Sequence, residues 1–75
     1  MSLSMKTTDD LVRIASAGGG FVVEAGRRTT EELVKISAAA RQSGATVVFR
    51  NMGIRKTEAL LKIAAAGKGK VVFES

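Results

Sequence analysis

Apolar and small residues recur at a helical spacing in three segments of the chain. In each segment they fall at i, i+3, i+4 and i+7, the positions that share one face of an α-helix. The residues are Leu11, Ile14, Ala15 and Gly18; Leu33, Ile36, Ser37 and Ala40; and Leu60, Ile63, Ala64 and Gly67. The pattern predicts three amphipathic helices.

Threonine and acidic residues mark the expected starts of these helices. Thr29 and Glu32 have the spacing of a capping box, and Thr7 and Asp10 form a near match to it. A Gly-containing segment follows each helical pattern, as is typical of helix ends. A short run rich in Val and Phe comes next in each case, and such runs are typical of strands. The runs are Phe21–Glu24, Val47–Arg50 and Val71–Glu74.

The chain therefore has the order α-β-α-β-α-β and belongs to the α/β class. We predict three αβ repeats, at about residues 6–26, 27–53 and 54–75, within a single domain of residues 5–75. Residues 1–4 are expected to be a leader, disordered or derived from a tag. Strands that a helix separates pair in parallel, through right-handed crossovers.

Two sheet topologies fit this order. Strand order 2-1-3 would divide the helices between both faces, whereas order 1-2-3 places all of them on one face. Aligning the repeats puts large apolar residues on one face of the sheet and valines with charged residues on the other. The apolar face holds Phe21, Val23, Val47, Phe49, Val71 and Phe73. We predict order 1-2-3, with the helices over this face and a solenoid-like form.

This architecture resembles leucine-rich-repeat-type solenoids, which have one helix and one strand per repeat. The resemblance is confined to architecture, because the Leu/Asn ladder around the strand is absent. Neither end repeat has an obvious polar cap, so a fragment of a longer repeat array remains an alternative.

Composition removes most catalytic chemistry. The sequence contains no His and no Cys, which excludes the commonest general base, metal ligand and strongest nucleophile. We therefore expect no enzyme, no cofactor and no metal site. No segment reads as a signal sequence or a membrane span, and the lack of cysteine is consistent with a cytoplasmic protein.

The second face of the predicted sheet is the first candidate for function. Val22, Val48 and Val72 form an apolar stripe there, although parallel sheets are normally covered on both faces. The charged residues of this face are Glu24, Arg50 and Glu74. We expect a non-catalytic module that binds itself, as a dimer or larger oligomer, or another protein. It would associate through this face or through the unpaired sheet edges.

Basic turns before the helices are the second candidate. Arg27, Arg28, Arg55 and Lys56 should gather where the strands end, the edge at which α/β proteins bind ligands. The formal net charge of +5 also favours nucleic acid or a phosphate anion. First-turn acids oppose an anion there, and no aromatic platform for bases is present. We keep anion binding as the alternative function.

Overall fold

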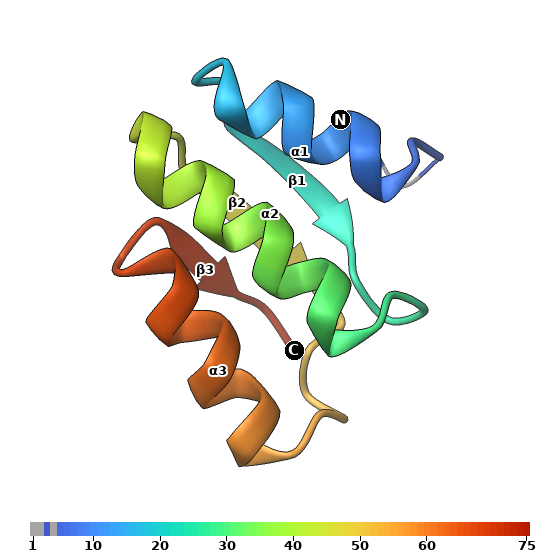
Figure 1. Ribbon diagram of the computed structural model, residues 1–75. Helices are drawn as coiled ribbons and strands as arrows, with labels where there is room; N and C mark the ends of the chain where they lie inside the picture. The colour runs from blue at the N-terminus through green and yellow to red at the C-terminus, as the bar shows by residue number, and fades with distance from the viewer. Residues whose placement is uncertain (1–2, 4) are drawn as a thin grey trace.

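A computed structural model describes residue 3 and residues 5–75 (Figure 1). Its elements follow the predicted alternating order. They are α1 (Thr8–Ser16), β1 (Phe21–Glu24), α2 (Thr30–Ser43), β2 (Val47–Arg50), α3 (Thr57–Gly67) and β3 (Val71–Phe73). The protein is of the α/β class.

The strands form one parallel sheet in the order β1-β2-β3, as the sequence predicts. Val22 lies beside Val48 and Val48 beside Val72, so the register is the one that aligning the repeats gives. The sheet does not curl, and the solenoid-like part of the prediction is not evident within one chain.

All three helices lie on the same side of the sheet (Figure 1). The apolar strand residues face them, and Val23, Val47 and Phe49 are fully buried. Val71 and Phe73 are only partly buried, because β3 is an edge strand and nothing in the described part lies beyond it. The core therefore closes around the first two repeats and is open beside the third.

Side-chain caps fix the start of two helices. The N–H of Asp10 donates to Thr7 Oγ1 at 3.1 Å. Thr29 and Glu32 form the complete capping box that their spacing predicts. Lys56 is the N-cap of α3 and provides no side-chain cap, so the third helix starts without the bond that fixes the other two.

The two sheet edges differ. On the β1 edge, the N–H of Leu3 donates to the carbonyl of Val22 at 3.0 Å, and the Leu3 side chain packs against the core. The predicted leader otherwise concerns residues 1, 2 and 4, which lie outside the described residues. On the β3 edge, Val71 and Phe73 direct their backbone groups away from β2, because Lys70 and Glu74 bond to β2.

Gly20 allows a close approach between repeats. A Cβ atom at this position would lie 2.6 Å from the Thr46 carbonyl oxygen, a backbone atom that also accepts the Phe21 N–H. We expect Gly20→Ala to lower the free energy of unfolding by about 1–3 kcal/mol, because β1 must shift away from β2. Urea denaturation followed by circular dichroism measures this change.

The matched control is Gly53→Ala. Its Cβ would lie 3.2 Å from the Cβ of exposed Ser75, a contact that a shift of a few tenths of an ångström relieves. This control should stay within about 0.5 kcal/mol of the wild type. Equal losses in both variants would contradict the proposed backbone contact.

Candidate functional site

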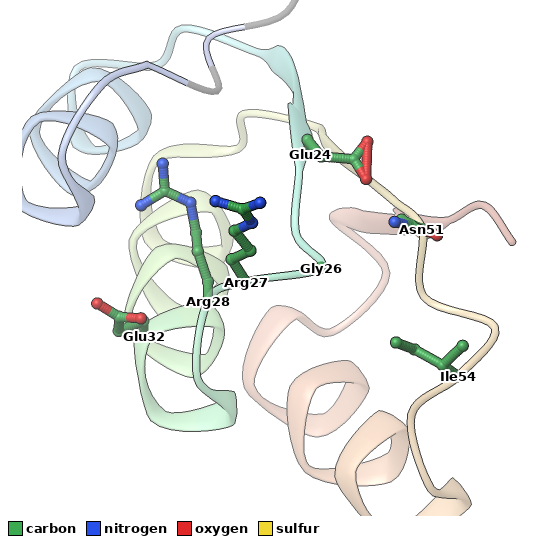
Figure 2. A pocket seen from close by; sticks show the side chains of 7 residues that line it. All are labelled: Glu24, Gly26, Arg27, Arg28, Glu32, Asn51 and Ile54. Carbon is green, nitrogen blue, oxygen red and sulfur yellow. The ribbon is translucent and has the colours of Figure 1, made fainter.

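The loops after β1 and β2 border an open hollow at the carboxyl ends of the strands (Figure 2). Its volume is about 540 Å³. The lining residues are Glu24, Gly26, Arg27, Arg28, Glu32, Asn51 and Ile54. Two arginines and two carboxylates thus share the site, so its charge does not select for an anion alone.

Arg28 connects the second repeat to the first. Its Nη1 donates to Thr8 Oγ1 at 2.8 Å, and its Nη2 donates to the Lys6 carbonyl at 2.6 Å. The Thr8 hydroxyl in turn donates to Glu32 Oε2 at 3.1 Å. These contacts hold the start of α1 beside the start of α2. They also occupy the guanidinium group of Arg28, which the sequence indicates as a candidate for binding an anion.

Arg55 repeats this contact one unit later. Its Nη1 donates to Thr30 Oγ1 at 3.4 Å, and its Nη2 donates to the carbonyls of Ala25 and Arg28. Its Nε is buried and has no partner within the described residues. We call Arg28 and Arg55 the inter-repeat arginines, because each joins a repeat to the one before it.

The other two predicted anion ligands are placed differently. Arg27 and Lys56 are exposed on the loops that lead into α2 and α3. Arg27 and Arg28 line the hollow described above, whereas Arg55 and Lys56 line a second hollow beside the start of α3. Two of the four, Arg28 and Arg55, hold repeats together. Anion binding would rest on Arg27 and Lys56.

Glu32 is the acid that these contacts affect most. The Thr29 N–H donates to Glu32 Oε1 at 2.8 Å, and the Thr8 hydroxyl donates to Oε2. These hydrogen bonds, led by that from the Thr29 backbone, hold the pKa of the Glu32 carboxyl below its ordinary value of 4.5, with a smaller contribution from the Arg28 charge. The same hydrogen bonds cap α2 and join it to Thr8 of α1, so Glu32 has a structural role.

The second face of the sheet holds the predicted interface residues. Val22 and Val48 are partly exposed and Val72 is 45% exposed, and no helix of residues 5–75 crosses this face. We call the valines with Glu24, Arg50 and Glu74 the open sheet face. Arg50 Nε lies 3.3 Å from Glu74 Oε1, with both side chains about half exposed, so this pair contributes little stability.

Neither a metal centre nor a membrane span emerges from the described residues. Residue 3 and residues 5–75 contain no group of three or more side chains placed to hold a metal ion. None of their helices combines the length and the apolar character needed to span a bilayer. Comparison with protein-family models, curated proteins and solved structures found no match.

Sequence reasoning missed the inter-repeat arginines, although the sequence carries their signal. Lys6, Arg28 and Arg55 each stand two residues before a threonine, at Thr8, Thr30 and Thr57. A basic residue in the same place in every repeat indicates a contact between repeats as readily as a ligand site. The hydrogen-bond acceptors decide between the two, and the sequence does not show them.

Arg55→Ala should destabilise the fold. The change removes hydrogen bonds from a charged, partly buried donor to Ala25, Arg28 and Thr30. We expect the free energy of unfolding to fall by about 1.5–3 kcal/mol, measured by urea denaturation. Arg27→Ala removes an equal charge from an exposed position and should change stability by about 0.5 kcal/mol or less. Equal effects would mean that the Arg55 contacts add no stability.

Glu32 should make stability depend on pH. Because folding lowers its pKa, its contribution is complete above the ordinary value of 4.5 and is lost as the pH falls through the folded-state value. Glu32→Gln should therefore cost most stability at neutral pH and progressively less in acid. Glu31→Gln removes the same charge from the same helical turn and is the control. A difference between Glu32→Gln and the wild type that does not change with pH would contradict this role.

Proposed function

We propose that this protein is a non-catalytic association module that binds a second copy of itself or another protein. The observation that supports this proposal most directly is the open sheet face. A parallel sheet with helices on both sides buries both of its faces, whereas here the three valines of one face stay in contact with solvent. An apolar surface of this kind, bordered by charged residues, is typical of a protein–protein interface.

The sequence supports the non-catalytic part of the proposal. No His or Cys is present, and the carboxylate with a shifted pKa, Glu32, is used in a capping box. The absence of Cys also agrees with a cytoplasmic location, which we include in the proposal.

Solenoid-like stacking of repeats is a second way to associate. Each repeat is a unit that cannot cover its own apolar flank, so further units of the same kind are natural partners. The sheet edges belong to this second mode, and the open sheet face to the first.

Anion or nucleic-acid binding is the rival function. Exposed Arg27 and Lys56, together with the net charge of +5, support it. The inter-repeat arginines weaken it, since their guanidinium groups already bond to Thr8, Thr30 and backbone carbonyls. Glu24 and Glu32 beside the same hollow also repel an anion.

Light scattering after size exclusion, over a concentration series at low and high salt, tests association. The wild type should have a mass above the 7.9 kDa of one chain, and this excess should survive high salt because the interface is apolar. Val48→Glu should reduce the mass toward one chain, because it places a charge at the centre of the open sheet face. Val72→Glu, at a more exposed position, repeats the test if Val48→Glu does not fold.

Lys35→Glu is the control, since it changes charge on the exposed side of α2 and should leave the mass unchanged. A wild type that stays at one chain throughout would contradict the proposal. Salt-sensitive DNA binding that Arg27→Ala with Lys56→Ala abolishes would instead support the rival function.

A further inference from the structure

Equivalent positions of the three repeats differ in burial according to their neighbours. Leu11 and Leu33 are fully buried, whereas Leu60, their counterpart in α3, is partly exposed. Val12 and Val34 are partly buried, whereas their counterpart Leu61 is 63% exposed. Thr8 and Ala15, which bond to the second repeat, lie three or four residues from Leu11 and Val12 and share their side of α1. These positions therefore face the following repeat, and the third repeat has none within the described part.

The opposite side of the helices shows the reverse trend. Ile36 lies one turn after Glu32, which bonds to Thr8 of the preceding helix, and Ile36 and its counterpart Ile63 are fully buried. Ile14, their counterpart in α1, is partly exposed. It lies in a hollow of about 420 Å³ along the outer side of α1. The residues of this hollow are Lys6, Asp10, Arg13, Ile14 and Ala17.

The exposed side of α3 and the exposed side of α1 correspond to the two surfaces that pack together at each junction between repeats inside the molecule. We define the α3 flank as Thr57, Leu60, Leu61 and Ala64, and the α1 flank as the hollow just described. In α1 and α2, the residues equivalent to the α3 flank pack against the next helix. In the second repeat, Arg28 and Glu32, the equivalents of Lys6 and Asp10, bond to Thr8 of α1, and Ile36, the equivalent of Ile14, is fully buried. Figure 1 places α1 and α3 on opposite sides of α2.

We propose that a second copy of this chain docks its α1 flank against the α3 flank, so that the array of repeats continues from one molecule to the next. This inference rests on the proposed association with a second copy and places it on a surface other than the open sheet face. Leu61 of one copy would enter the hollow that contains Ile14 of the other.

Polar groups on the two flanks match in the same way. At the first internal junction, Thr8 accepts a hydrogen bond from Arg28 and donates one to Glu32. Thr57 is the equivalent of Thr8 and is exposed. Lys6 and Asp10 are the equivalents of Arg28 and Glu32, and both line the α1 flank. A second copy therefore brings a cation and a carboxylate to Thr57 in the places where the first junction has them.

The strand edges would allow β3 of one copy to pair with β1 of the next, but one contact on the β1 edge competes with this pairing. Val71 and Phe73 present outward backbone groups that a further parallel strand would pair. On the other copy, the N–H of Leu3 bonds to Val22 on the β1 edge. Strand pairing across the junction requires Leu3 to leave, whereas the contact between the helix flanks does not.

A junction of this kind joins two different surfaces. It leaves one free flank at each end, so it gives a series of lengths and not a closed dimer, unless a ring forms. Pairing through the open sheet face would stop at two copies. The two modes therefore predict different masses as well as different sensitive residues.

Two flank variants test the proposal by sedimentation or light scattering. Leu61→Glu blocks the α3 flank, and Ile14→Glu blocks the α1 flank. If Ile14→Glu does not fold, Asp10→Lys replaces it as the variant of the α1 flank. Each alone should weaken association by about tenfold or more. Mixed together, they should form a complex of two chains and no more, because each supplies the flank that the other lacks.

The outcomes separate the two proposals. If the wild type associates but neither flank variant changes its mass, the flank junction is wrong and the open sheet face remains. If neither variant associates with itself and the mixture of the two also keeps the mass of one chain, a junction between two different flanks is excluded. A wild type of one chain at every concentration overturns the flank junction and the proposed function together.

Discussion

Helices are wider than strands, and the rest of this structure depends on that difference. Neighbouring strands lie about 4.8 Å apart, whereas packed helices lie about 8–10 Å apart. Every strand here carries its own helix on the same face, so the helix layer must extend beyond the sheet on both sides. Small buried residues such as Ala15, whose carbonyl accepts a hydrogen bond from Ser43 of α2, bring the helices close and reduce the mismatch. Figure 1 shows α1 and α3 displaced outward from β1 and β3, which leaves their outer flanks uncovered.

Most of the fold could be predicted from the sequence because its signals are local and repeated. The capping box at Thr29 and Glu32 and the apolar spacing of the helices need no knowledge of distant contacts. The alignment of Val22, Val48 and Val72 even gave the strand register, since equal repeats place equal residues side by side. The bond from Leu3 to Val22 joins parts of the chain that no repeat pattern relates, and it could not be predicted.

The candidate site was harder to interpret because the sequence does not say what a cation contacts. Charge and position alone do not distinguish Arg28 and Arg55 from Arg27 and Lys56. The structure separates them, because Arg28 and Arg55 donate hydrogen bonds to the preceding repeat. Part of the net positive charge thus stabilises the stacking of repeats and does not mark a ligand. The same residues show how the repeats recognise one another, through a threonine hydroxyl between a cation and, at the first junction, a carboxylate.

The missing cap at Lys56 has a consequence for the order in which the chain opens. The third repeat has no side-chain cap at its helix, has Ala59 where the second has Glu32, and is covered on one side within the described part. In repeat proteins each unit adds its own stability and that of its contacts with neighbours. Amide hydrogens of α3 and β3 should therefore exchange with solvent before those of the first two repeats. The α3 flank is thus on the unit that unfolds most readily, and a neighbour bound there would stabilise the whole chain by keeping that unit folded.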